Sequence, residues 1–130
     1  MKKETNKKIE EQIMLLIKTM KSIIETEHEN ILYYNMNDPE KAIQYIKEKQ
    51  EPTLLKIETA CKNYFPKITD TEQRGYFLKI IENFAKYKAI IYTIIKKPDK
   101  ELLKRMMEEL NETYENLRKS IKNYEEHILR

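Results

Sequence analysis

Apolar residues recur every three or four positions along almost the whole chain, which is the period of an amphipathic helix. The first such stripe runs through about residues 6–36 and ends at "NMNDPEKA". There, Asn37 or Asp38 can cap a following helix. Pro39 suits the first turn of that helix, because an amide at this position would have no helical partner in any case. The pattern therefore predicts one helix over residues 6–36 and a second that begins near Pro39.

The second apolar stripe extends over about residues 39–64 and contains a proline in its interior. Pro52 has no amide donor, and its ring crowds the carbonyl group four residues earlier. Prolines inside helices are a common cause of sharp bends. We therefore predict that the second helix is kinked near residues 48–52.

A third helix is predicted over residues 70–96, after the polar stretch "YFPKITDTEQ". Thr69 and Glu72 have the spacing of a capping box, in which the hydroxyl accepts from a first-turn amide and the glutamate reaches back. Asp70 is a competing cap at the same boundary. The apolar residues that follow step by three and four, which favours burial of this helix against more than one neighbour.

The last segment, about residues 99–129, carries the most regular pattern in the chain. Lys97 precedes Pro98 and is biased out of helical geometry, which favours a tight reversal before this helix over one continuous rod. About 30 helical residues span roughly 45 Å, so the pattern leaves open whether residues 98–130 fold back or project. The apolar positions form an uninterrupted heptad seam: Leu103, Met107, Leu110, Tyr114, Leu117, Ile121, Tyr124 and Ile128.

This seam is the candidate binding surface of the chain. A tyrosine suits a surface that is buried only part of the time, because its ring packs while its hydroxyl group stays in water. The alternative is that the seam closes the core of a monomer, since helix-in-groove recognition uses the same spacing as core packing. If a partner helix binds here, the expected contact residues are Met107, Leu110, Tyr114, Leu117, Ile121, Tyr124 and Ile128.

The composition agrees with a helical protein. The chain has 130 residues, 36% of them charged, with one Gly, four Pro and no Trp. Such a chain is long enough to bury a core, and it lacks the turn residues that a protein of many strands needs. We predict a single all-α domain over residues 1–130: an antiparallel bundle of three to four long helices with a long C-terminal amphipathic helix.

The charge pattern limits the classes of partner. The net charge is +3, and the two signs are interspersed except in the short run with Lys2, Lys3, Lys7 and Lys8. Proteins that bind nucleic acid usually collect basic residues on one face, so no nucleic acid is expected as a partner. No apolar run approaches the roughly 20 residues of a membrane span, and membrane insertion is not expected. A single cysteine rules out an intrachain disulfide, and a cytoplasmic location is expected.

Glu25-x-x-His28 is the only pattern that suggests a metal site. Diiron bundles need a second Glu-x-x-His and two further inward carboxylates, whereas His127 has Tyr124 at the matching position. His28 lies in line with the apolar stripe of its helix, which predicts a histidine at the edge of the core. Cys61 also lies on an apolar stripe and is expected to be a small hydrophobic residue, not a nucleophile. We therefore expect no cofactor, no metal and no enzymatic activity.

Residues 15–58, "LLIKTMKSIIETEHENILYYNMNDPEKAIQYIKEKQEPTLLKIE", resemble the FlgN family of flagellar export chaperones. The apolar helix and the long amphipathic helix that follow extend the similarity over most of the chain. Two prolines depart from the family pattern: Pro52, where relatives continue the helix, and Pro98, which marks a break. The matching residues are Glu29, Asn30, Leu32, Asp38, Lys49, Leu54 and Leu55.

The resemblance implies a cytosolic chaperone that holds hook–filament junction proteins before type III secretion. Its C-terminal helix would mask the amphipathic helix of the partner, without nucleotide or metal. The alternative hypothesis is a self-associating structural or adaptor bundle, a homodimer in which the same seam pairs with its own copy. The residues implied in masking are Leu110, Tyr114, Leu117, Ile121 and Tyr124.

Overall fold

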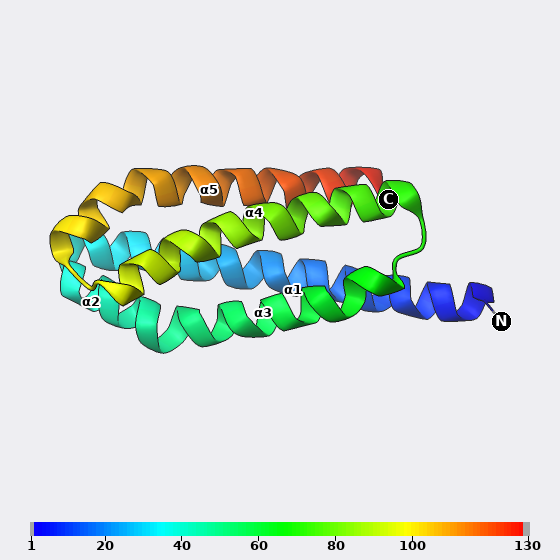
Figure 1. The fold of residues 1–130 in the computed structure, drawn as a ribbon, viewed down its shortest axis with the longest axis horizontal. Helices are drawn as coiled ribbons and strands as arrows, with labels where there is room; N and C mark the ends of the chain where they lie inside the picture. Colours follow the sequence, from blue (N-terminus) through cyan, green and yellow to red (C-terminus); the bar gives the residue numbers. More distant parts are fainter. Residues whose placement is uncertain (1, 129–130) are drawn as a thin grey trace.

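The computed structural model describes residues 2–128, with side chains from residue 7 onward. In this part of the chain all regular structure is helical, which confirms the predicted all-α fold class (Figure 1). In chain order the elements are α1 (Lys2–Asn37), α2 (Pro39–Tyr45), a π-helical segment (Ile46–Gln50), α3 (Glu51–Tyr64), a 3₁₀ turn (Phe65–Lys67), α4 (Thr71–Lys96) and α5 (Lys100–His127).

Helices α4 and α5 form an antiparallel hairpin. Gln73, at the start of α4, donates a hydrogen bond to the hydroxyl of Tyr124 near the end of α5 (2.7 Å). Further along, the Asn83 amide of α4 lies 3.4 Å from the carbonyl oxygen of Asn116 in α5. Helix α5 therefore folds back along α4 and does not project from the bundle (Figure 1).

Helix α1 lies beside α5 and runs in the opposite direction. Lys21 forms an ion pair with Glu125 (3.2 Å), whereas His28, two turns later in α1, contacts Asn111, about four turns earlier in α5 (2.8 Å). Helix α3 completes the bundle by packing against α1 and α4 (Figure 1). Each long helix thus buries one face against its neighbours.

Aspartates cap the helices where the sequence suggested possible breaks. Asp38 accepts a hydrogen bond from the Glu40 amide at the start of α2. Asp70 accepts from the Gln73 amide (2.8 Å) and caps α4. The predicted Thr69 capping box is therefore wrong: α4 starts one residue later than such a box requires, and the competing cap takes its place.

The predicted kink coincides with the π-helical segment Ile46–Gln50, where the Glu51 amide bonds to the carbonyl of Ile46. Pro52 then lies in the first turn of α3, directly after this segment. The wider π-helical turn also brings Gln50 fully into the core. Single π-helical turns inside helices often lie at functional sites.

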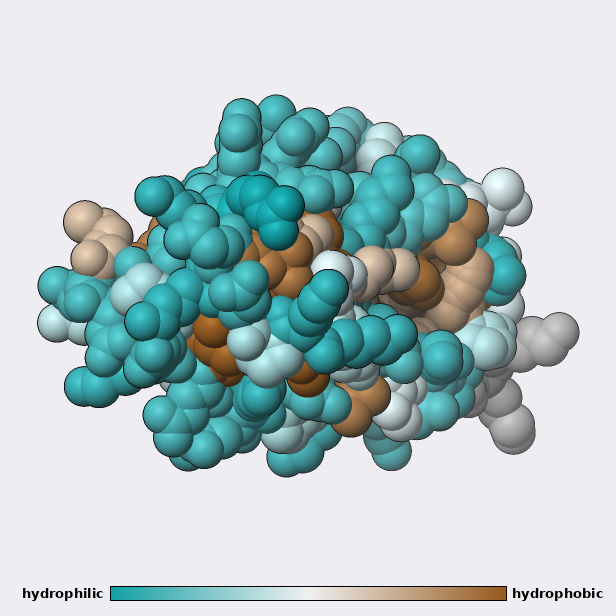
Figure 2. Space-filling view, turned by 60° about the vertical axis from the view of Figure 1, so that its left-hand side comes forward, coloured by the Kyte–Doolittle hydropathy of each residue, from teal (hydrophilic) through white to brown (hydrophobic). Residues whose placement is uncertain are grey.

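Apolar side chains from every long helix fill the centre of the bundle, and the outer surface is largely hydrophilic. Figure 2 shows hydrophilic residues over most of the visible face, with smaller hydrophobic areas between them. Every helix in residues 2–128 is too short or too polar to span a lipid bilayer. Among the side chains that the structure describes, the exposed large apolar residues are Leu15, Tyr33, Met36, Leu55 and Leu78.

Candidate binding surface along helix α5

The heptad seam of α5 is buried inside the bundle. Helices α1 and α4 cover it. The seam therefore forms part of the core of the monomer, which was the alternative to a binding surface. Its proposed binding role stays a prediction, and a partner can reach the seam only if α5 first separates from the bundle. Of the seven residues named as contacts, Met107, Leu110, Leu117, Ile121 and Tyr124 are buried, and Tyr114 and Ile128 are partly buried.

Tyr124 illustrates how completely the seam is closed. Its ring packs edge-on against Phe77 of α4 at a centroid distance of 6.0 Å. Its hydroxyl accepts a hydrogen bond from Gln73 and does not remain in water as the sequence reasoning required. Burial raises the pKa of Tyr124.

Midway along the bundle, a polar layer of Gln50, Tyr87, His28, Asn111 and Tyr114 crosses the core. The Gln50 amide donates to the Tyr87 hydroxyl (3.0 Å), which lies 3.0 Å from Nδ1 of His28. Nε2 of His28 lies 2.8 Å from Oδ1 of Asn111, an acceptor. Nε2 therefore carries the imidazole proton, and Tyr87 donates its own proton to Nδ1.

His28 is neutral within this layer. It is 2% exposed, and its ring stacks on that of Tyr114 at 3.9 Å with an angle of 9° between the planes. Burial lowers the pKa of His28, and the hydrogen bond to Asn111 opposes this effect only in part. Sequence reasoning placed His28 at the edge of the core, whereas the structure places it well inside.

The carboxylate of Glu25 faces α5, where it lies 3.7 Å from Nε of Arg118. Over the residues that the structure describes, no three side chains of His, Cys, Asp or Glu come close enough together to hold one metal ion. Hydrogen bonds join Gln50, Tyr87, His28 and Asn111 within the polar layer, and Tyr114 stacks on His28.

Glu27 lies beside the polar layer and is 7% exposed. Burial raises the pKa of Glu27 to about 7, and a hydrogen bond from Thr53 opposes the rise. The Oε1 atoms of Glu27 and of Gln50 are both buried without a hydrogen-bond partner. A buried acceptor without a partner costs on the order of 1–3 kcal/mol, so these two atoms reduce the stability of the fold.

Cys61 is buried, and burial raises the pKa of its thiol to about 11. Because only the thiolate reacts, we expect Cys61 to be modified slowly by iodoacetamide at pH 8 in the folded protein. In denaturant the same thiol should react at the rate of a free cysteine, which mass spectrometry over a time course can measure. Equal rates in the two conditions would contradict the burial.

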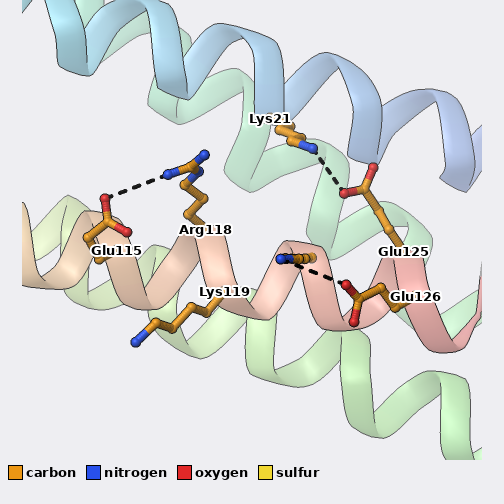
Figure 3. Close-up of a pocket in the computed structure, with 7 residues that line it drawn as sticks. Lys21, Glu115, Arg118, Lys119, Glu125 and Glu126 are labelled. Carbon is orange, nitrogen blue, oxygen red and sulfur yellow. Dashed lines mark hydrogen bonds and ion pairs between the residues drawn. The ribbon is translucent and has the colours of Figure 1, made fainter.

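A groove of about 650 Å³ separates α5 from α1, and its lining carries both signs of charge (Figure 3). Lys21 of α1 pairs with Glu125 of α5, Arg118 lies 3.9 Å from Glu115, and Lys119 extends away from these pairs (Figure 3). The remaining lining residues, Lys122 and Glu126, also lie 3.9 Å apart. The cations in this groove therefore largely face carboxylates of the same chain.

A second groove, of about 480 Å³, lies between α5 and α4. Its only charged lining residues are Lys79 and Lys119, and it contains no carboxylate. The other lining residues are Tyr76, Asn83, Asn116, Ser120 and Asn123. The two grooves along α5 thus differ in charge as well as in the helix that forms their far wall.

Sequence reasoning missed the second groove although a signal for it was present. Each polar residue on this side of α5 stands immediately before a residue of the seam, so a second repeat runs beside the first. From residue 113 onward its members carry no formal charge, whereas Glu109, one turn earlier at the corresponding place, is charged. They are Thr113, Asn116, Ser120, Asn123 and His127, and the last stacks on Tyr76 of α4.

No protein-family model, curated protein or solved structure matches the chain.

Proposed function

We propose that the protein is a cytosolic export chaperone that binds an amphipathic helix of a hook–filament junction protein before type III secretion. The observation that carries the proposal is the position of α5, a 28-residue helix whose residues 115–126 border one groove and whose residues 116–123 border another. The resemblance of residues 15–58 to the FlgN family supports the choice of partner. Binding, not catalysis, is the activity that this arrangement supports.

The partner helix is expected to dock beside α5 while the bundle stays closed. The seam residues are covered by α1 and α4, so contact with them would first require the core to open. The grooves need no such step. The grooves border residues 115–126 of α5, about three helical turns, which is enough to hold an amphipathic segment of the partner and to keep it from premature assembly.

The test is a binding titration of the purified protein against each hook–filament junction protein of its own organism, followed by calorimetry. We expect a 1:1 complex with a Kd of about 10 μM or tighter, equivalent to roughly 7 kcal/mol. Junction proteins from which the terminal helices have been deleted are the control, and they should not bind. If no junction protein binds at roughly ten times that concentration, the chaperone proposal fails.

Sedimentation distinguishes the chaperone from the self-associating bundle. A chaperone with a closed core should remain a monomer over a wide concentration range and form a larger species only with its partner. A stable dimer that persists when a junction protein is added would favour the structural alternative.

A further inference from the structure

Ion pairs are fewer along the α4/α5 groove than along the α1/α5 groove. Lys79 lies 3.6 Å from Glu82 of its own helix, a residue outside the lining, and Lys119 borders both grooves. On the α1 side, carboxylates of the chain lie next to the cations, and the pair between Lys21 and Glu125 joins the two helices. On the α4 side, Lys79 and Lys119 line the groove without any carboxylate among the lining residues. The α4/α5 groove therefore has a net positive lining, whereas the α1/α5 groove is close to balanced.

The floor of the same groove is polar but uncharged. Ser120 donates to the carbonyl of Leu117 (2.7 Å), which turns its hydroxyl into the helix and leaves room above it. Asn116 and Asn123 are exposed, so their amides can bond to a partner without breaking contacts in the core. Such a floor accepts small side chains and hydrogen-bonding groups more readily than large apolar ones.

We propose that the α4/α5 groove is the docking site for the partner helix, and that this helix carries carboxylates along the edge that faces Lys79 and Lys119. The inference rests on the proposed function and names the surface that performs it. Carboxylates on the partner would supply the negative charge that the groove itself does not contain, and complementary charges also set the register of docking.

A second copy of the chain fits this groove poorly. Symmetric dimers place the same patch of one subunit against that of the other. The contact would then bring Lys79 and Lys119 close to their own copies, with no carboxylate of the groove between them. Like charges in a contact are unfavourable, so a different protein with acidic edges is the occupant that the groove supports.

Two designed helical peptides of about 21 residues test the charge requirement. Both present alanine, serine and leucine at heptad contact positions; one has glutamates on its edges and the other has lysines. We expect the acidic peptide to bind the intact protein about tenfold more tightly than the basic one, with a preference that weakens as salt is added. Equal affinities for the two peptides would overturn the inference.

A matched pair of variants tests the location. Lys79→Glu changes the charge of the α4/α5 groove alone, and Lys122→Glu makes the same change in the α1/α5 groove. Both lysines are largely exposed, so both variants should fold, and circular dichroism checks this. We expect Lys79→Glu to lower the affinity for the acidic peptide roughly fivefold. Lys122→Glu should lower it less than twofold. A larger loss of affinity in Lys122→Glu than in Lys79→Glu would place the binding site in the α1/α5 groove.

The same variants separate this inference from the chaperone proposal. If a junction protein binds and Lys79→Glu leaves its affinity unchanged, the groove assignment is wrong while the function stands. If the acidic peptide binds in the groove and no junction protein does, the groove assignment stands while the function fails. A dimer of the wild-type protein that Lys79→Glu dissociates would overturn the inference in favour of a second copy.

Discussion

Replacing Leu117 with alanine is expected to lower the free energy of unfolding by about 2–5 kcal/mol. The Leu117 side chain is fully buried where α5 packs into the bundle. Its removal would lose apolar contacts and leave a cavity that the rigid helices can only partly close. Urea unfolding followed by circular dichroism at 222 nm measures the change as a shift in the midpoint.

Leu15→Ala is the matched control, since it makes the same substitution at a side chain that is 66% exposed on α1. Its free energy of unfolding should stay within about 0.5 kcal/mol of the wild-type value. If Leu117→Ala were as mild as Leu15→Ala, the seam would not be packed in solution as it is in the structure. The seam would then be free for a partner, and the binding role predicted from the sequence would regain its basis.

Helix bounds were predictable because the period of a helix and its breaks are local properties of the sequence. The third and fourth helices were expected over residues 70–96 and 99–129, and the structure has them at Thr71–Lys96 and Lys100–His127. The prolines explain this agreement, since a proline and the residue before it restrict the backbone regardless of tertiary contacts. At the Thr69 boundary, two good caps competed one residue apart, and local rules could not rank them.

Whether the α5 seam forms the core or binds a partner could not be predicted from local sequence. A core and a docking surface require the same spacing of apolar residues, so periodicity cannot say which neighbour covers the seam. The polar layer could not be predicted from the sequence for a different reason. His28 and Tyr87 lie 59 positions apart in the chain, and Gln50 and Tyr87 lie 37 positions apart. Only the packing of the bundle brings them together.

Glu27 and His28 give the bundle two pH dependences of opposite sign. The folded Glu27 carboxyl keeps its proton up to about pH 7, whereas the unfolded one loses it near 4.5, so this group lowers stability as the pH rises through that window. The folded His28 stays neutral where the unfolded imidazole takes up a proton, below about 6.5, so this group raises stability as the pH rises. The two slopes oppose each other in the wild-type protein.

Glu27→Gln should therefore stabilise the protein in a way that depends on pH. Near pH 4.5 the variant and the wild type should be about equally stable, because glutamine and a protonated glutamate make similar contacts. The difference should grow as the pH rises and approach about 3 kcal/mol above pH 7, since each pKa unit corresponds to about 1.4 kcal/mol. Chemical unfolding of both proteins between pH 4.5 and 8 measures the difference, in which the contribution of His28 cancels.

Glu29→Gln, on the exposed side of the same helix, removes a carboxylate that is not buried and serves as the control. Its stability should stay within about 0.5 kcal/mol of the wild-type value over the same pH range, because the substitution lies on the surface and leaves the core unchanged. A difference between Glu27→Gln and the wild type that is the same at every pH would mean that Glu27 ionises alike in the folded and unfolded proteins, contrary to its burial. Water or a cation would then have to reach its Oε1 atom, and the centre of the bundle would be wet. A difference that grows with pH up to about 7 would instead show that the folded protein holds the Glu27 carboxyl uncharged beside the polar layer.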